Sequence, residues 1–229
     1  MNKPLSKYLI FLILILLVLI SSCSNNFKKN ETNLTPQKNV TLDESKIIIV
    51  AYGDSLTEGL YVDRNYAYPA VLERKLIERG YNVKVYNSGL SGETSSAALN
   101  RVEWVLKLNP DIVILGIGAN DAMRGINLNL TKQNIENIIL KLEENNVTVI
   151  LSGQEIFENL GKDYSSDFKD IYPKISKEQN VTLIPFFLEG VAANSSLNNI
   201  DEIHPNKEGY EIIVEKNVLP IVVQIIEKK

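Results

Sequence analysis

The chain has 229 residues and a formal net charge of −4, and it contains one cysteine, Cys23, and one histidine, His204. An acidic chain makes a nucleic-acid partner improbable, a single cysteine excludes an intrachain disulfide, and one Cys with one His excludes a structural zinc site of the usual kind. If a serine nucleophile is activated by a histidine base, that base can only be His204.

The N-terminal segment has the pattern of a bacterial lipoprotein signal. Two lysines precede an unbroken apolar and aromatic run over 8–20, which is shorter than the roughly 20 residues of a membrane-spanning helix. Two serines then stand directly before Cys23, which resembles a lipobox. We expect a signal peptide over 1–22, export to the bacterial cell envelope and a lipid on Cys23. The alternative is a secreted protein in which Cys23 is incidental.

The next segment, 23–45, is rich in Asn, Lys, Thr and Ser and has almost no apolar side chains. Such a stretch cannot bury enough surface to offset the entropy lost on ordering. We therefore expect a flexible tether that holds a folded domain, 46–229, close to a membrane surface.

From residue 46 onward, short β-branched runs alternate with segments of helical spacing. We expect strands over 47–51, 83–86, 111–115, 147–151 and 182–184, and helices over 68–79, 95–108, 131–144, 168–179 and 207–226. Thr131 is the expected N-cap of the third helix, and Pro220 is expected to kink or break the last one. Continuously apolar strands are typical of a parallel sheet with helices on both faces, so the sequence predicts one α/β domain around a five-stranded parallel sheet.

Polar segments follow the strands of this predicted sheet. In such folds ligands bind beyond the carboxyl ends of the strands, which directs attention to these segments. Three of them follow the first three strands and the fourth lies near the C-terminus, at 53–59, 87–94, 116–121 and 201–205.

Together these four segments resemble the blocks of the GDSL or SGNH hydrolase family, named for a Ser, a Gly, an Asn and a His. The resemblance runs from about residue 47 to about residue 226 and is closest to secreted bacterial enzymes described as multifunctional thioesterase, lysophospholipase and arylesterase. Further matching segments are 67–69, 120–125, 171–174, 184–187 and 203–206. The resemblance implies a three-layer α/β/α sandwich with flavodoxin-like strand order and hydrolysis of esters or thioesters without a metal or cofactor.

The residues at the matching positions can be given chemical roles. Ser55 follows the first strand at the family's nucleophile position, and His204 is the base that must take its proton. Asp201 precedes His204 by three residues, close enough to reach the imidazole Nδ1 and fix its tautomer. By resemblance, the oxyanion is bound by the backbone N–H groups of Ser55 and Gly92 and by the side-chain amide of Asn120.

Each of these residues also has a purely structural interpretation. The alternatives are a helix N-cap at Ser55, a turn glycine at Gly92, a loop amide at Asn120 and a cap before Pro205 at His204. We expect Asp54 to hold the Ser55 loop through backbone N–H groups, and Trp104 to pack in the core.

The substrate-binding residues are less sharply indicated. Apolar side chains after Asn120 and near residue 186 are candidates for an acyl-chain groove, although core packing fits Phe186 and Phe187 equally well. Tyr61 and Tyr66 are candidates to cover its entrance. The tentative substrate-binding set is Met123, Arg124, Ile126 and Phe186.

These observations favour a monomeric, lipid-anchored serine esterase that forms an acyl-enzyme on Ser55. Its expected substrates are small-molecule or lipid esters: aryl and acyl esters, thioesters and lysophospholipids. One alternative within the same family is a deacetylase of cell-envelope polysaccharide. An alternative of a different class is a catalytically silent surface lipoprotein that keeps the fold as a binding module.

Overall fold

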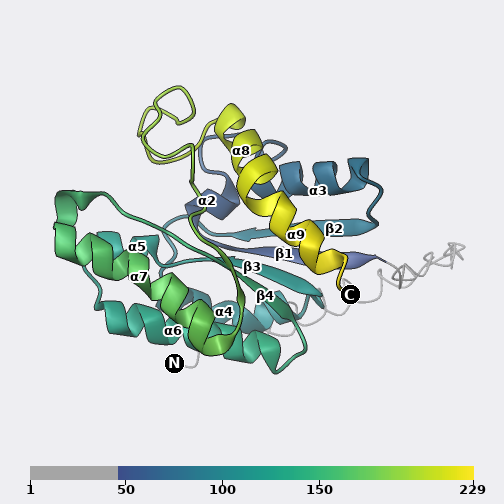
Figure 1. The fold of residues 1–229 in the computed structure, drawn as a ribbon, viewed down its shortest axis with the longest axis horizontal. Coiled ribbons are helices and arrows are strands. Elements are labelled where there is room, and N and C mark those ends of the chain that lie inside the picture. Colours follow the sequence, from purple (N-terminus) through teal and green to yellow (C-terminus); the bar gives the residue numbers. More distant parts are fainter. Residues whose placement is uncertain (1–45) are drawn as a thin grey trace, which may run out of the picture. The chain divides into compact units, whose positions relative to one another are not determined.

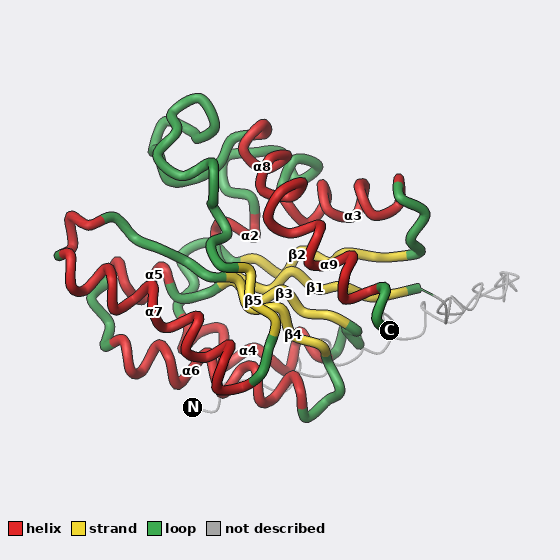
Figure 2. The backbone as a smooth tube through the Cα atoms, in the orientation of Figure 1, coloured by secondary structure: helices red, strands yellow, loops and turns green. Residues whose placement is uncertain are grey.

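The computed structural model describes residues 46–229, so the predicted signal peptide, Cys23 and the tether over 23–45 lie outside the described residues. The domain is built on a five-stranded parallel sheet in the order β2-β1-β3-β4-β5 (Figure 2). The strands are β1 (Ile47–Gly53), β2 (Val83–Gly89), β3 (Ile112–Gly116), β4 (Thr148–Ser152) and β5 (Thr182–Ile184). The predicted fold class and its flavodoxin-like strand order are confirmed.

Helices cover both faces of the sheet (Figure 1). One face carries α3 (Tyr68–Glu78), α8 (Lys207–Ile213) and α9 (Leu219–Ile226), and the other carries α4 (Ser95–Leu106), α6 (Leu128–Glu143) and α7 (Lys162–Gln179). Among residues 46–229, no helix is both long and apolar enough to cross a membrane.

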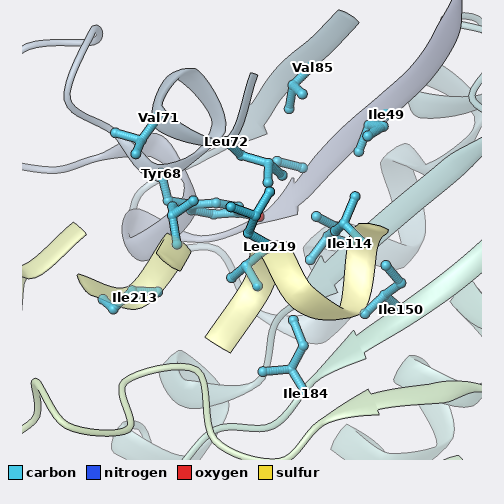
Figure 3. Close-up of a cluster of buried hydrophobic side chains, with 14 of the residues drawn as sticks. Ile49, Tyr68, Val71, Leu72, Val85, Ile114, Ile150, Ile184, Ile213 and Leu219 are labelled. Carbon is cyan, nitrogen blue, oxygen red and sulfur yellow. The ribbon is translucent and has the colours of Figure 1, made fainter. Parts of the chain in front are cut away.

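Successive residues of the central strands face opposite layers, because side chains alternate along a strand. Ile49 of β1 and Ile114 of β3 pack towards α3 and α9, where Leu72 and Leu219 meet them (Figure 3). The next residue along each strand, Val50 in β1 and Leu115 in β3, belongs to the second core, which lies under α4, α6 and α7. Both faces of the sheet are therefore buried, which explains why these strands are apolar runs without alternation.

Three short elements at the carboxyl edge of the sheet were not predicted. They are α2 (Ser55–Glu58), α5 (Ala119–Met123) and the 3₁₀ turn η1 (Glu158–Leu160). None is long enough to show a helical period in the sequence. The first two matter most, because they carry two of the residues assigned to the site.

Two predicted helix starts were wrong. Helix α7 begins at Lys162 and not at residue 168. Helix α6 begins before Thr131, because Asn127 is the N-cap and accepts the Asn129 N–H at 2.9 Å. The Thr131 side chain is instead buried, with its hydroxyl 3.3 Å from Oδ1 of Asp121. The predicted C-terminal helix over 207–226, with a break near Pro220, is confirmed. A π-helical segment, η2 (Val214–Val218), joins α8 to α9, and Pro220 lies in the first turn of α9, where no backbone donor is needed.

The expectation that Trp104 packs in the core was also wrong. Its side chain is 69% exposed, and the ammonium of Lys107 lies 4.4 Å from the ring centroid. Helix α4 ends at Leu106, so the partner at Leu108 that suggested an apolar face lies beyond the helix. The tryptophan ring is covered by a lysine rather than by the sheet.

Candidate active site

Ser55 is the first residue of α2, directly after β1. Asp54 caps this helix, with Oδ1 accepting the Leu56 N–H at 3.1 Å, as expected of a loop-holding aspartate. The hydroxyl of Tyr210 donates to the Leu56 carbonyl at 3.0 Å from the other side. A Cβ on Gly89 would lie 2.1 Å from the Glu58 nitrogen, so only glycine lets α2 rest on the end of β2. These contacts fix Ser55 at the carboxyl edge of the sheet.

The structure brings Ser55, His204 and Asp201 together in one relay. Nε2 of His204 lies 2.8 Å from the Ser55 Oγ, and Nδ1 lies 2.5 Å from Oδ2 of Asp201. The other Asp201 oxygen accepts the backbone N–H groups of Ile203 (3.1 Å) and His204 (3.0 Å). Partial burial acts to raise the pKa of Asp201, but the hydrogen bonds from the backbone and ring of His204 outweigh it and hold this pKa below its usual value.

The loop that carries the histidine is held by an asparagine that the sequence reading missed. The backbone N–H of Asn199 donates to the His204 carbonyl at 2.8 Å, and its side chain donates to the carbonyls of His204 (3.2 Å) and Pro205 (3.0 Å). The ring of Tyr61 packs edge-on against the imidazole, with centroids 5.6 Å apart. The histidine is thus fixed through its backbone, its ring face and its Nδ1.

Asn120 lies in the short helix α5 and is 9% exposed. Its Nδ2 lies 3.4 Å from Oδ2 of Asp54, so the amide is oriented by the residue that precedes the nucleophile. Asp54 is itself only 1% exposed, and this burial raises the pKa of its carboxyl to about 7. A second N–H of the Asn120 amide remains for a ligand.

Gly92 has φ +77°, a conformation in the left-handed region that favours glycine. The residues around it are tied to two other elements. The Glu58 carboxylate accepts the Ser91 N–H at 2.7 Å and also the Ser91 hydroxyl. Nη2 of Arg124 donates to the Gly92 carbonyl at 2.8 Å. The Gly92 peptide is therefore held on both sides, by Glu58 in the nucleophile helix and by Arg124 directly after α5.

The next residue, Glu93, anchors the same loop from beneath. Its side chain is buried and paired with Arg101 of α4, with Oε2 and Nη2 2.5 Å apart. Arg101 also donates to the Ser88 hydroxyl at 2.8 Å and to the Ser88 carbonyl at 2.9 Å. The carboxylate is thus buried as part of an ion pair with its hydrogen bonds made, the condition under which burial of a charge is tolerated.

A cavity of about 430 Å³ opens beside this cluster. Leu56, Ala119 and Ile203 line it, and each is the chain neighbour of a residue assigned to the site. The remaining lining residues are mostly apolar and come from the segments after β4 and β5: Gly153, Gln154, Glu155, Ile156, Phe157, Leu160, Phe186, Phe187, Leu188, Ala192 and Ala193, with Met123 and Glu202 from elsewhere. The cavity is a mainly apolar space that reaches Leu56, the residue after Ser55.

The tentative substrate-binding residues divide into two pairs. Met123 and Phe186 line the cavity. Arg124 and Ile126 do not, since Arg124 holds Gly92 and the Ile126 carbonyl accepts the Tyr164 hydroxyl at 3.4 Å.

Of the other aromatic candidates, Phe187 touches the cavity but is 3% exposed and packs edge-on against the Tyr68 ring, at 5.1 Å. Its neighbour Phe186 is therefore the more accessible of the two phenylalanines. Tyr66 lies beneath the ammonium of Lys207, 4.3 Å from the ring centroid. Tyr61, in contrast, packs on the His204 ring and is 64% exposed, so it is the tyrosine next to the relay.

The arrangement as a whole is that of a serine hydrolase on a doubly wound α/β sheet. A hydroxyl, an imidazole and a carboxylate are hydrogen-bonded in series, and the Asn120 amide contacts Asp54, the residue before the hydroxyl-bearing Ser55. Within residues 46–229, no group of three or more His, Cys, Asp or Glu side chains is placed to hold a metal ion.

Comparison with known proteins specifies the family. Residues 51–212 match the GDSL-like lipase/acylhydrolase family. An arylesterase from Vibrio mimicus is 34% identical over 168 residues, which is 73% of this chain and 84% of the relative. The thioesterase 1/protease 1/lysophospholipase L1 of Escherichia coli K12 is 33% identical over 178 residues, 76% of this chain and 84% of the relative.

Solved structures agree with this result. The crystal structure of TesA superposes with a TM-score of 0.75 at 30% identity, covering 78% of this chain and 99% of TesA. AlinE4, an SGNH-hydrolase family esterase, gives a TM-score of 0.66 at 34% identity and covers 79% of this chain and 97% of AlinE4. The chain belongs to the GDSL-like lipase/acylhydrolase family, and it is a carboxylic ester hydrolase. The family resemblance found in the sequence is confirmed.

Proposed function

We propose that this esterase cleaves acyl and aryl esters and thioesters through an acyl-enzyme on Ser55. The Ser55 Oγ attacks the carbonyl carbon of the ester while its proton moves to Nε2 of His204, 2.8 Å away. Asp201 keeps the proton of the neutral imidazole on Nδ1, so that Nε2 is free to accept, and stabilises the imidazolium that forms.

The tetrahedral intermediate then collapses in the usual two-step manner. The imidazolium gives its proton to the departing alcohol or thiol, and the carbonyl re-forms as an ester on Ser55. A water molecule enters beside His204, which takes its proton as the water attacks the acyl carbon. The carboxylic acid leaves and the proton returns to Ser55.

Three donors are assigned to the oxyanion: the backbone N–H groups of Ser55 and Gly92 and the side-chain amide of Asn120. The support for this assignment is that each donor is held by its surroundings, Ser55 by the cap at Asp54, Gly92 by Arg124 and Asn120 by Asp54. Donors fixed before the reaction need no reorganisation as charge develops, and each is typically worth about 3 kcal/mol in the transition state.

The observation that carries the proposal is the hydrogen-bonded series from Ser55 through His204 to Asp201. We expect Ser55→Ala to abolish turnover of p-nitrophenyl esters and to prevent labelling by a fluorophosphonate, while the thermal unfolding temperature is unchanged. A Ser55→Ala protein that keeps full turnover would show that the nucleophile is elsewhere. Failure of the unmodified protein to be labelled would instead support a silent binding module.

The cavity favours an acyl group larger than acetyl. The acyl group stays on Ser55 after the alcohol has left, so a recess beside the nucleophile suits the part of the substrate that remains attached. An acetyl group would fill only a small part of about 430 Å³ lined mainly by apolar side chains. Lysophospholipase appears among the names of the relatives, and cleavage of a long-chain acyl ester fits such a cavity better than polysaccharide deacetylation does.

Chain length tests this assignment. We expect kcat/KM for p-nitrophenyl esters to rise from the acetate to medium-length acyl chains, and to exceed the rate on acetylated xylan or chitin oligomers. The variant Met123→Ser places a polar side chain in the cavity lining. We expect it to lower kcat/KM for esters of medium-length acyl chains more than for p-nitrophenyl acetate. A protein most active on acetylated sugars would overturn the acyl-ester assignment in favour of the deacetylase.

We propose further that the enzyme is anchored in the bacterial cell envelope by lipid on Cys23. The support is the basic, apolar and small-residue pattern of residues 1–23. In cells expressing the full chain, we expect the protein in the membrane fraction, labelled by a radioactive fatty acid. Cys23→Ser should remove the label. A membrane-bound, unlabelled protein that Cys23→Ser does not change would contradict the anchor.

A further inference from the structure

Two buried polar side chains, at the end of β4 and two residues after it, have no hydrogen-bond partner among the described residues. Gln154 is 5% exposed, and its amide makes no hydrogen bond to another of the described residues. The hydroxyl of Ser152, which is 1% exposed, likewise has no hydrogen-bond partner within the described part of the chain. A Cβ placed on Gly116 would lie 3.4 Å from the Gln154 Nε2 and 3.9 Å from the Ser152 Oγ, so the two groups are close to one point.

The backbone between these residues is fully used. The Gly153 N–H donates to the Ile184 carbonyl at 2.8 Å, and the Gly153 carbonyl accepts the Phe187 N–H at 2.9 Å. The Gly153 peptide groups are therefore held in place, while the side chains of Ser152 and Gln154 have no hydrogen-bond partner among the described residues. Buried polar groups in native proteins are nearly always hydrogen-bonded, and an unpartnered one calls for an explanation.

The position of Gln154 supplies that explanation. Gln154 is one of the residues that line the cavity, with apolar neighbours such as Ile156 and Phe186. An enclosed amide at the wall of a substrate cavity offers one donor group and one acceptor to whatever enters.

The charges around the cavity indicate what kind of group would pair with this amide. No Lys, Arg or His is among the lining residues, so an anionic group has no counter-ion there. Of the two acidic lining residues, Glu155 is paired with Lys169 at 2.7 Å, and Glu202 is exposed. The interior next to Gln154 therefore suits a neutral hydrogen-bonding group, because an unpaired charge in an apolar space is costly.

We propose that Gln154, with Ser152 behind it, forms a polar subsite that binds a neutral hydroxyl or oxo group on the acyl chain of the substrate. This inference rests on the proposed function, since it places the acyl group in the cavity. It makes Gln154 a specificity-determining residue that selects functionalised acyl chains over plain hydrocarbon chains of the same length. A site built to hydrogen-bond a substrate hydroxyl discriminates against the analogue that lacks it, because its own buried groups are then left unpaired.

The test compares p-nitrophenyl octanoate with its hydroxyoctanoate isomers, in which the hydroxyl stands at successive carbons. For the full-length enzyme we expect at least one isomer to be hydrolysed with a kcat/KM about tenfold above that of the plain ester. In Gln154→Met, which keeps an unbranched side chain of similar size, that ratio should fall to about one, chiefly through faster hydrolysis of the plain ester.

Gln179 provides a matched control. It also has an unpartnered side-chain oxygen, but it ends α7 and does not line the cavity. Gln179→Met should keep the full preference. If Gln154→Met does not fold, Ser152→Ala tests the same subsite, and it should reduce the preference severalfold without loss of structure, because it removes an atom that has no partner.

The outcomes separate the two proposals. Equal kcat/KM for the plain ester and every hydroxylated isomer would overturn the subsite while leaving the esterase assignment intact. A preference that survives in Gln154→Met would also overturn it. Absence of turnover on all of these esters would overturn the proposed function, and the subsite with it.

Discussion

The side-chain nitrogen of Asn120 lies 3.4 Å from Oδ2 of Asp54, and both residues are buried. Asp54 also caps the helix that begins with Ser55. One carboxyl group therefore positions both the nucleophile helix and the amide assigned to the oxyanion. Because an amide nitrogen has two hydrogens, the contact fixes the plane of the Asn120 amide and leaves the second hydrogen for substrate.

Replacement of Asn120 by alanine tests this assignment. We expect kcat to fall about 10²–10³-fold with little change in KM, because the amide acts on charge that develops only in the transition state. The measurement is steady-state hydrolysis of a p-nitrophenyl ester. Asn129→Ala is the control, since Asn129 is exposed and lies in the first turn of α6. A loss confined to KM would assign Asn120 to ground-state binding instead.

We assign to Asp201 the orientation of His204, whose Nδ1 it contacts at 2.5 Å, and its amide variant tests that role. In Asp201→Asn the side-chain oxygen still accepts the Ile203 and His204 N–H groups, but an NH₂ group faces Nδ1 of His204. The imidazole then carries its proton on Nε2 and cannot accept one from Ser55, so we expect kcat to fall about 10⁴-fold. An Asp201→Asn enzyme within tenfold of the unmodified one would contradict this role.

The lowered pKa of Asp201 has a consequence for stability. A carboxyl group whose pKa is lower in the folded state stabilises the fold above its unfolded pKa, about 4, and loses this contribution as the pH falls through the folded pKa. When the pH is lowered below 4, the free energy of unfolding measured with urea should therefore fall more for the unmodified protein than for Asp201→Asn. Identical acid dependence of the two proteins would show that Asp201 titrates normally.

Glu58 is predicted to act as a positioning residue for the Gly92 N–H. Glu58 lies three residues after Ser55, and its carboxylate accepts the Ser91 N–H at 2.7 Å. It therefore sets the distance between Ser55 and the loop that contains Gly92. We expect Glu58→Ala to lower kcat about tenfold, less than loss of a donor itself would. Glu58→Gln should recover most of the rate, since an amide oxygen also accepts the Ser91 N–H.

The control for Glu58 is Glu78→Ala, which removes an exposed carboxylate at the end of α3. It should leave kcat, KM and thermal stability unchanged. A merely structural role for Glu58 would lower the unfolding temperature without changing the kcat of the folded enzyme. Equal kcat values for Glu58→Ala and the unmodified enzyme would therefore contradict the positioning role.

Much of the fold was readable in the sequence, because the central strands β1, β3 and β4 are apolar runs that both layers of helices must cover. The Ser55, Asp201 and His204 series was also accessible, since a single histidine left one choice of base and Asp201 stands three residues before it. Each of these signals comes from a short stretch of sequence or from a residue type that occurs once in the chain. They needed no knowledge of how distant segments pack.

The errors arose where packing between distant segments decides. Thr131 has the residue type of an N-cap, but its hydroxyl bonds to Asp121, ten residues away. Trp104 has helical spacing to Leu108 only if α4 continues past Leu106, which it does not. Gln154 gave no signal at all, because a lone glutamine after a strand is unremarkable until the structure shows it enclosed and without a partner.

The raised pKa of Asp54 yields a final prediction. Its carboxyl, driven by burial from 3.8 to about 7, holds a proton in the folded state that the unfolded chain has already released. Protons are then lost on unfolding between pH 4 and pH 7, so this group makes the protein less stable as the pH rises through that range. The resulting decrease in the free energy of unfolding between pH 4 and pH 7 is about 4 kcal/mol.

Asp54→Asn removes this titration, while its side-chain oxygen can still cap Leu56. We expect the free energy of unfolding of the variant, relative to the unmodified protein, to rise by about 4 kcal/mol between pH 4 and pH 7. Urea unfolding at pH 4, 5.5 and 7 measures it, and taking the difference cancels the other titrating groups. A difference independent of pH would mean that Asp54 is ionised throughout, stabilised by its contacts with Leu56 and Asn120 more strongly than burial opposes it.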